Sequence, residues 1–162
     1  MARQHGDLRK AKGLLLLILL LLFSMLFFAR AQANQAGETA VYECSLMPND
    51  TICIDRYFGD ANIVFIPSQV YGRDVTKIRK YAFQGCSAKR IYTPETLVEI
   101  GEGAFQNCKQ LEHIKLKNGL ERVGKFAFRG CAKMNTITLP ASLREVDGSA
   151  FILCSILRTI HV

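Results

Sequence analysis

The sequence predicts a solenoid of short stacked coils that is rich in β-strand and contains little helix. Three observations predict this fold class: an Ala-Phe pair recurs about every 23 residues, a cysteine follows each phenylalanine at one offset, and aliphatic residues keep the same period. Self-similarity at a fixed period of this size is typical of repeat proteins. The fold should therefore depend on contacts between coils, because one short unit cannot bury its own apolar face.

The Ala-Phe pair and the cysteine place one aromatic ring and one thiol in every coil. The phenylalanines are 22, 23 and 23 residues apart, and each cysteine follows its phenylalanine by three positions. The two columns are Phe83, Phe105, Phe128 and Phe151, and Cys86, Cys108, Cys131 and Cys154. We expect both columns to run through the core. The cysteines should form a ladder of free thiols, because buried cysteine behaves as a small hydrophobe and the spacing matches no close metal-binding pair.

A third set of recurring residues defines the strand of each coil. One isoleucine column consists of Ile91, Ile114, Ile137 and Ile160. Around these residues apolar and polar positions alternate, as in a half-buried strand, and stacked copies would form a parallel sheet. Pro94 and Pro140 end the segment where the chain must turn.

Residues 41–61 are predicted to form a β-hairpin that caps the first coil. Two strand-like runs, 41–46 and 51–57, flank a Pro-Asn-Asp turn. Cys44 and Cys53 are symmetric about this turn on opposite arms. We expect them to face each other across the hairpin and form a disulfide. The repeat domain follows and covers 62–162, beginning with a longer unit.

The amino terminus has the three parts of a secretory signal peptide. A basic stretch precedes an apolar run from 14 to 29, and Ala31-Gln32-Ala33 supplies a cleavage site. We assign 1–33 as the signal peptide and 34–40 as a flexible lead-in. The protein should then be secreted, or held at the cell surface or in the periplasm. The alternative is an uncleaved segment that anchors the chain, which would be its one contact with a membrane.

The positive charge of the chain lies largely in the predicted signal peptide. The whole sequence has a net charge of +7, but removal of 1–33 leaves 16 Lys and Arg against 13 Asp and Glu, or +3. A nucleic-acid partner would need a basic surface on the mature domain, so we do not expect one. The sequence also contains no signature of a cofactor or a metal site: Gly101-Glu102-Gly103 lacks the third glycine of a dinucleotide loop.

No arrangement of residues in the repeats predicts an enzyme. Only His113 and His161 remain after cleavage, and both fall at outward-facing strand positions, whereas the repeat cysteines point inward. A nucleophile needs a base beside it, and this geometry keeps the two groups apart. Ser149 lies in a Gly-Ser-Ala sequence that is not a nucleophile elbow. We therefore predict a non-enzymatic protein without catalytic residues.

The repeat resembles the BspA-type leucine-rich repeat family, a cysteine-containing class with 23-residue units found in surface proteins of bacteria. The resemblance rests on the four Ala-Phe-x-x-Cys copies, on Met134 to Pro140 as the strand motif, and on Ile66-Pro67-Ser68 upstream. Two departures are Ala88, which stands near the usual leucine, and Lys117, which stands where proline is expected. The resemblance implies a leucine-rich repeat solenoid, an α/β-class horseshoe with a stacked parallel sheet. It also implies adhesion to host or neighbouring-cell proteins.

The residues that flank each buried isoleucine form the candidate ligand face. They should lie on the exposed side of the sheet, which is the usual recognition surface of a solenoid. The candidate contacts are Arg90, Tyr92, His113, Lys115, Thr136, Thr138 and His161. A protein ligand is the expected partner, and a face that only keeps the protein soluble is the alternative.

The last coil differs from the others and suggests a second function. Ile152, Leu153 and Ile156 occupy positions that are polar or glycine in earlier coils. An exposed apolar patch of this kind needs a cover. The coil is then a self-sealing cap, an end-to-end contact with a second chain, or an internal coil of a longer array. The end-to-end contact would make the protein an envelope scaffold that self-associates.

Overall fold

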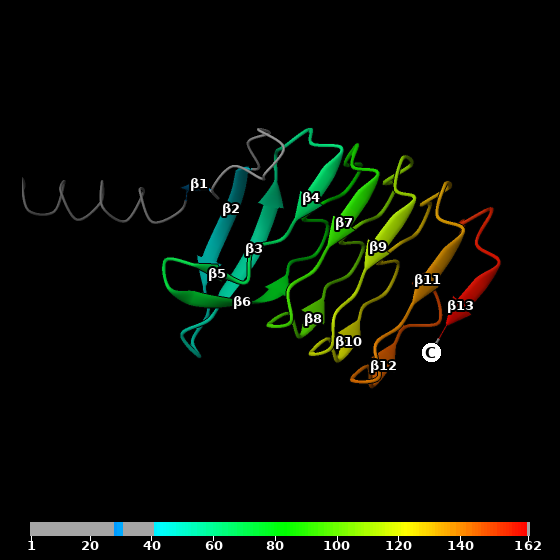
Figure 1. The fold of residues 1–162 in the computed structure, drawn as a ribbon. Helices are drawn as coiled ribbons and strands as arrows, with labels where there is room; N and C mark the ends of the chain where they lie inside the picture. Colours follow the sequence, from blue (N-terminus) through cyan, green and yellow to red (C-terminus); the bar gives the residue numbers. More distant parts are fainter. Residues whose placement is uncertain (1–27, 31–40, 162) are drawn as a thin grey trace, which may run out of the picture.

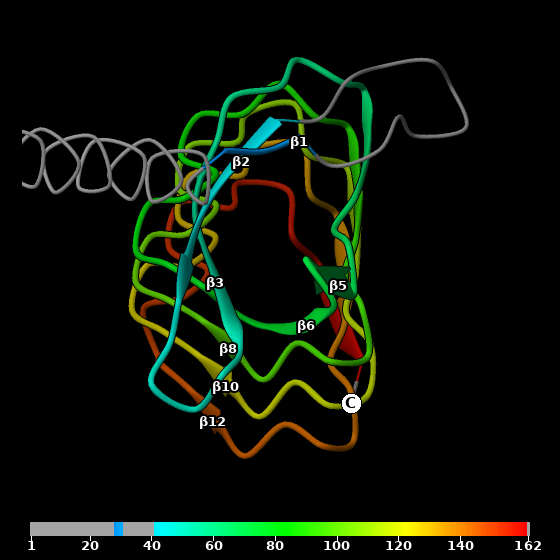
Figure 2. The ribbon, with the colours of Figure 1, turned by 90° about the vertical axis from the view of Figure 1, so that its left-hand side faces the viewer.

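The fold is a solenoid of stacked coils, and every secondary-structure element that the structure describes is a β-strand. The computed structural model describes residues 28–30 and 41–161, and within them it contains thirteen strands and no helix. The coils follow one another along a single axis (Figure 1), and a view along that axis shows them superimposed around a common interior (Figure 2). The predicted solenoid with parallel sheets is confirmed. Among the described residues, no helix is available that could cross a membrane.

An antiparallel hairpin lies at the amino-terminal end of the stack. It consists of β2 (Val41–Leu46) and β3 (Ile52–Tyr57), and β1 (Phe28–Arg30) adds a short antiparallel strand to its outer edge. On its other side β3 pairs in parallel with β6 (Arg73–Ile78), which belongs to the first coil. The hairpin thereby covers backbone groups that would otherwise be left at an open sheet edge.

The two cysteines of the hairpin are not directly opposite each other. The register that begins at the turn pairs Cys44 with Ile54 and Ser45 with Cys53, and a bulge follows beyond them, between Cys44 and Glu43. Both cysteines are buried free thiols, and burial raises the pKa of Cys44 to about 12 and that of Cys53 to about 11. The predicted disulfide is not formed in this structure, where the register of the turn offsets the two cysteines by one residue along the hairpin.

The strands of the coils form two rows along the axis (Figure 1). The first row contains β4 (Ile63–Phe65), β7 (Arg90–Tyr92), β9 (His113–Lys115), β11 (Thr136–Thr138) and β13 (Thr159–His161). The second row contains β6, β8 (Glu99–Ile100), β10 (Arg122–Val123) and β12 (Glu145–Val146), and β5 (Gln69–Val70) pairs with β6 in the longer first unit. Strands of successive coils that pair along either row are parallel, since each coil returns to the same side after one turn, whereas β5 and β6 of the first unit are antiparallel.

A column of aromatic rings runs through the interior and links all the coils. The ring centroids are 5.0 Å apart from Phe83 to Phe105, and 5.4 Å apart both from Phe105 to Phe128 and from Phe128 to Phe151. Tyr57 of the hairpin stacks on Phe83 at 4.9 Å and extends the column into the cap. The cap and the repeats therefore share one continuous core.

Backbone hydrogen bonds hold the short turns of the coils at the same spacing as the rings. The amide groups of Phe83, Phe105 and Phe128 each donate to the alanine carbonyl of the next coil at 2.8 Å. The residue before each repeat cysteine has a left-handed backbone, with φ values of 71°, 59°, 74° and 61°. These residues are Gly85, Asn107, Gly130 and Leu153. Glycine and asparagine tolerate this conformation, whereas leucine is strained in it.

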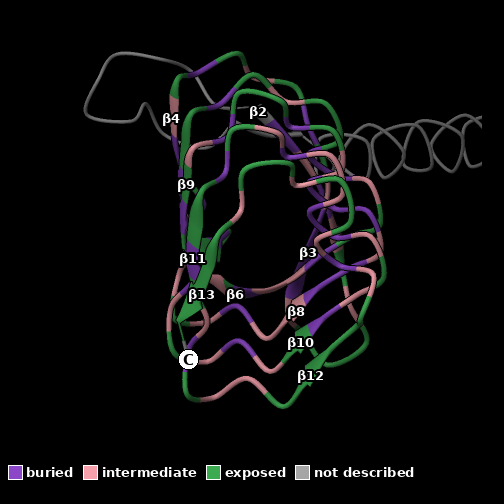
Figure 3. Cartoon of the chain, turned by 90° about the vertical axis from the view of Figure 1, so that its right-hand side faces the viewer, coloured by how far each residue is buried: buried purple, intermediate pink, exposed green. Residues whose placement is uncertain are grey.

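The carboxy-terminal coil leaves large apolar side chains in solvent. Figure 3, which views the stack from this end, shows the last coil mostly exposed. The exposed residues include Ile152, Leu153, Ile156 and Ile160, with Leu153 at 65%. Within the described part of the chain, no further strand pairs with β12 or β13. Among the described residues, the last coil thus leaves an apolar surface and two strand edges uncovered.

We predict that Phe128→Ala lowers the free energy of unfolding by about 3–5 kcal/mol, because the substitution leaves a cavity in a fully buried column. Urea unfolding followed by circular dichroism measures the change. The half-buried Phe151 is the matched control, and Phe151→Ala should cost less because its ring contacts a neighbour on one side only. Equal losses for the two variants would contradict a column whose interior rings carry the stability.

Candidate functional site

The first row of strands places the candidate ligand residues on one exposed face. Arg90 is paired with His113, and Tyr92 with Lys115, across β7 and β9. Further along, Thr136 and Thr138 of β11 are paired with Thr159 and His161 of β13. In each of these strands the outward side chains flank an isoleucine, and that isoleucine is buried in every coil but the last, where it is exposed. The predicted columns therefore share one face, with His161 at its carboxy-terminal end.

The first row is divided into two sheets between β9 and β11. The strands β4, β7 and β9 form one sheet and β11 and β13 another, and no ladder joins the two within the described residues. Elsewhere the residue that follows a strand donates to the next coil: Thr93 to the carbonyl of Lys115 at 3.1 Å, and Leu139 to that of His161 at 2.8 Å. The equivalent bond, from Leu116 to Thr138, is missing. We call this boundary between β9 and β11 the seam.

A surface cavity of about 430 Å³ lies along the seam. Five of the seven candidate ligand residues line it: Tyr92, His113, Lys115, Thr136 and Thr138. Its apolar lining consists of Ile91, Ile114, Leu116 and Ile137. The remaining candidates, Arg90 and His161, lie outside the cavity on the same row. The seam thus combines an apolar floor, polar side chains at its rim and backbone groups that no ladder occupies.

One departure from the repeat pattern helps to explain the local geometry at the seam. Lys117 occupies the position of Pro94 and Pro140, and unlike proline it has an amide hydrogen to donate. This amide donates to the hydroxyl of Thr93 at 3.1 Å, and the Thr93 hydroxyl donates to the carbonyl of Lys115 at 3.2 Å. Both bonds hold the end of β9 toward β7, on the side away from the seam.

An aromatic pair forms the amino-terminal end of the face. Phe65 of β4 stacks on Tyr92 of β7 with ring centroids 4.7 Å apart, and half of the Phe65 side chain is exposed. The sequence reasoning missed Phe65 because the first repeat is longer than the others. Its signal is the proline two positions later, since Pro67 follows Phe65 as Pro94 follows Tyr92.

The basic side chains of the first row have no acidic partners in the part of the chain that the structure describes. Within the described ranges, no ion pair involves Arg90, Lys115 or the neighbouring Lys89. Both Arg90 and Lys115 are exposed. The face therefore presents positive charge to solvent, and this charge can attract a complementary surface.

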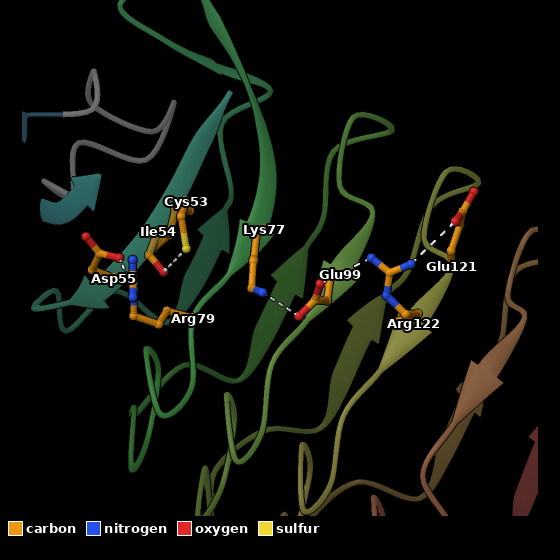
Figure 4. A network of polar contacts seen from close by, with 8 residues as sticks. All are labelled: Cys53, Ile54, Asp55, Lys77, Arg79, Glu99, Glu121 and Arg122. Carbon is orange, nitrogen blue, oxygen red and sulfur yellow. Dashed lines mark hydrogen bonds and ion pairs between the residues drawn. The ribbon is translucent and has the colours of Figure 1, made fainter. Parts of the chain in front are cut away.

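The second row shows the opposite arrangement, in which charges on successive coils are paired (Figure 4). Glu99 lies between Lys77 at 2.7 Å and Arg122 at 3.2 Å, and Arg122 also reaches Glu121 of its own coil at 3.8 Å. Partial burial raises the pKa of Glu99, but the bonds from Lys77 and Arg122 outweigh it and leave the pKa below its usual value. Because these charges are neutralised by one another, the second row is a weaker candidate than the first for binding a charged partner.

The described residues offer no assembled catalytic or metal-binding group. No cluster of three His, Cys, Asp or Glu side chains lies close enough to hold a metal ion in this part of the chain. His113 is exposed on the first row, whereas Cys108 is fully buried in the interior. The predictions that the chain has no catalytic residue and needs no cofactor stay predictions.

Comparison with protein families identifies the repeat. A model described as the BspA type leucine-rich repeat region matches six copies over residues 62–162. The chain belongs to the BspA-type leucine-rich repeat family. Leucine-rich repeats of this kind are protein-interaction modules, and they are generally scaffolds rather than enzymes. Comparison with curated protein sequences gives no match.

Solved leucine-rich repeat structures share the BspA-type fold of this chain. The leucine-rich repeat protein of T. pallidum is 28% identical, with a TM-score of 0.59 over 74% of this chain and 67% of that one. A leucine-rich repeat protein from Bacteroides capillosus is 23% identical, with a TM-score of 0.66 over 82% of this chain and 97% of that one. A leucine rich cell surface protein from Faecalibacterium prausnitzii is 24% identical, with a TM-score of 0.60 over 74% and 40%.

We predict that Glu99→Gln destabilises this BspA-type domain at pH 7 and much less at pH 3. The Glu99 pKa is lower in the folded chain than in the unfolded chain, so its stabilisation is present above the unfolded value and is lost as the pH falls through the folded value. The loss at pH 7 should be at most about 1 kcal/mol because the group is partly solvated. Urea unfolding at both pH values measures it.

Glu95→Gln is the matched control for this prediction. Glu95 lies 3.6 Å from Lys117, but its side chain is 76% exposed, so its ion pair should contribute almost nothing at either pH. A Glu99→Gln variant with the same deficit at pH 3 and pH 7 would show that lost packing, rather than the ion pairs, explains the effect.

Proposed function

We propose that this chain is an exported, non-enzymatic module that binds partner proteins through the first row of strands. The observation that carries the proposal is the seam, where an apolar cavity is bordered by Tyr92, His113 and Lys115. Elsewhere along the rows, each strand uses its backbone groups to pair with a neighbour. At the seam these groups face a cavity that is open to a ligand, among side chains of mixed polarity.

Rigidity supports this role. The row is held by buried isoleucines below it, and the coils are fixed to one another by the aromatic column. A partner that binds such a surface loses little free energy to ordering it, so modest contacts suffice for specific recognition. Tyr92 and its stacked neighbour Phe65 add a large apolar contact of the type that is enriched in protein interfaces.

The charge of the face indicates the chemistry of the partner. Arg90 and Lys115 are exposed and make no ion pair among the described residues, and His113 of β9 is paired with Arg90 of β7. A partner with an acidic surface would complete the electrostatics of this row and would associate faster at low salt. The partner is thus a protein with an acidic patch next to an apolar group that fits over Phe65 and Tyr92.

The cellular role that we propose is adhesion to host or neighbouring-cell proteins. Residues 1–33 have the pattern of a signal peptide, and a structurally similar protein of Faecalibacterium prausnitzii is described as a cell surface protein. Of this segment, only Phe28–Arg30 lies within the described residues, as β1; the rest of it, and the lead-in at 34–40, lie outside them. Cleavage after Ala33 would remove β1 and leave β2 as the edge strand. Amino-terminal sequencing of the protein from culture distinguishes this outcome from a retained membrane anchor.

We predict that Lys115→Glu weakens the capture of surface proteins by the purified domain. The substitution reverses a charge at the rim of the cavity, and a reversed charge in a complementary interface should weaken binding by about tenfold or more. The measurement is capture of extracellular-matrix or cell-surface proteins on immobilised domain, followed by titration of the captured protein.

Lys109→Glu is the matched control, because Lys109 is exposed on a turn away from the first row and makes no ion pair in the described structure. It should leave the affinity unchanged. Capture that both variants lose equally would place the contact elsewhere or indicate non-specific charge attraction. A wild-type domain that captures nothing would argue against the binding function itself.

A second function, self-association into an envelope scaffold, is favoured by the carboxy-terminal coil. Ile152, Leu153 and Ile156 are exposed at 44%, 65% and 45%, and they lie beside the open edges of β12 and β13. Exposed apolar side chains and unpaired strand edges favour association with another copy of the chain, through apolar burial and strand pairing.

We predict that Ile152→Asp combined with Ile156→Asp keeps the protein monomeric, because two carboxylates in an apolar contact would remain desolvated and unpaired. Light scattering over a concentration series measures the mass. The wild-type chain should form dimers or larger species that the double variant does not. A wild-type chain that stays monomeric at every concentration would contradict this second function.

A further inference from the structure

The thiol ladder contains one pair of cysteines with an unusual environment. The Sγ atoms of Cys86 and Cys108, on adjacent coils, are 3.1 Å apart, and either sulfur can donate a hydrogen to the other. Cys108 is completely buried, whereas Cys86 is half-buried and reachable from solvent. Further down the ladder Cys131 is also completely buried. The pair thus joins a thiol that a reagent can reach to one that it cannot.

Backbone bonds fix these two coils at a spacing that suits a disulfide. The amide of Phe83 donates to the carbonyl of Ala104 and that of Gly85 to the carbonyl of Gln106, both at 2.8 Å, so these bonds fix the backbone directly before the two cysteines. Coils paired in this way are about 4.7–4.9 Å apart. Disulfides form between Cα atoms about 4.4–6.8 Å apart, so the sulfurs need only approach each other by about 1 Å.

We propose that Cys86 and Cys108 are an oxidisable dithiol, which a disulfide-bearing oxidant converts into a covalent bridge between adjacent coils. Cys86 is the thiol that reacts with the oxidant, and Cys108 is the thiol that then forms the disulfide with Cys86. The proposal is independent of the binding function of the first row, because the two cysteines belong to the turn segments of the interior.

The exchange proceeds in two balanced steps. The Cys86 thiolate attacks one sulfur of the oxidant R–S–S–R, which forms a mixed disulfide with Cys86 and releases R–S⁻. The Cys108 sulfur then attacks the Cys86 sulfur, which forms the Cys86–Cys108 bond and releases the second R–S⁻. The protons of the two protein thiols end on the two R–SH products. Two protein thiols are thereby oxidised, and one disulfide of the oxidant is reduced to two thiols.

The electrostatics of the pair favour this order of events. The hydrogen bond from Cys108 lowers the pKa of Cys86 despite partial burial, and the amide of Ala88 acts in the same direction. The pKa of Cys108 is raised, through its hydrogen bonds with Cys131 and Cys86 and through burial. Cys86 is therefore the better nucleophile toward an external disulfide, and Cys108 remains protonated until the mixed disulfide has formed.

The other end of the ladder supplies a control within the same molecule. Cys154 is half-buried like Cys86, but its thiol donates to the carbonyl of Phe128 at 3.1 Å, and burial raises its pKa to about 11. Near neutral pH this thiol should react at least about tenfold more slowly than Cys86, because far less of it is thiolate. Exposure alone would give the two cysteines similar rates.

The experiment treats the reduced protein with oxidised glutathione and maps the products by tryptic digestion without reduction. The proposal predicts a linked pair of peptides, 81–89 with 91–109. A bond between Cys108 and Cys131 would instead link 91–109 to 130–133. Cys44 and Cys53 share a single tryptic peptide, 31–56, so a bridge between them cannot be mistaken for either product.

Two variants make the mapping decisive. Cys86→Ser should abolish the linked pair, and Cys154→Ser should leave it unchanged. Stable glutathione on Cys86 without a bridge, a bond from Cys108 to Cys131, or equal linkage in both variants would each overturn the proposal. The proposal would also be overturned if oxidation produced the linked peptides only from the urea-unfolded wild-type protein and not from the folded one.

Labelling with iodoacetamide and unfolding in urea test the same pair by other readouts. Cys86 should be labelled at least about tenfold faster than Cys154 in the reduced protein, and of these two thiols oxidation should protect only Cys86. Oxidation should also shift the urea midpoint of the wild-type protein upward, and this shift should vanish in Cys86→Ser. Equal labelling of the two thiols, or a shift that persists in the variant, would contradict the proposed bridge.

Discussion

The contact of each phenylalanine with its copy in the next coil is the interaction on which the rest of this structure depends. The rings of Phe105, Phe128 and Phe151 are nearly parallel, with interplanar angles of 4° and 3°. A hydrogen bond from the same residue to the next coil fixes the backbone at the same height. Apolar burial and backbone pairing therefore select one spacing together. The strands of both rows inherit that spacing, which sets how side chains are arranged on the outer faces.

The two outer rows use the same spacing in different ways. On the second row, opposite charges on successive coils approach each other, as Glu99 does with Lys77 and Arg122, and their fields largely cancel. On the first row the basic residues Arg90 and Lys115 stand without counterions among the described residues. A rigid array whose charges cancel is inert toward partners, whereas one with uncompensated charge attracts them. The two rows thus differ in side-chain pairing, and also in backbone pairing, because the described strands of the first row are divided at the seam whereas those of the second row form one sheet.

The sequence was sufficient to predict the solenoid, its columns and the columns of the exposed face, because each depends on a residue type that recurs at one offset; Phe65, in the longer first unit, was missed. Features that depend on a single backbone event were not predictable. The register of the hairpin places Cys44 opposite Ile54 rather than opposite Cys53, and no residue type in the hairpin marks this offset of one residue. The seam is a loss of backbone hydrogen bonds, while the isoleucine columns continue across it as Ile114 and Ile137. Lys117 was the only visible departure near it.

The register of the stack also determines where the chain tolerates changes of length. The segment from Cys86 to Ile91 is one residue shorter than its counterparts, yet Ile91 still pairs with Ile114, and the buried Ala88 fills the place of a leucine. The additional residues of the first unit form β5 beside the second row without displacing either row. Insertions and deletions are therefore absorbed at corners, between positions that cannot move. A gene that encodes such a stack can diverge freely in its corner segments and can grow by duplication of whole units, while the geometry of the inherited face is preserved.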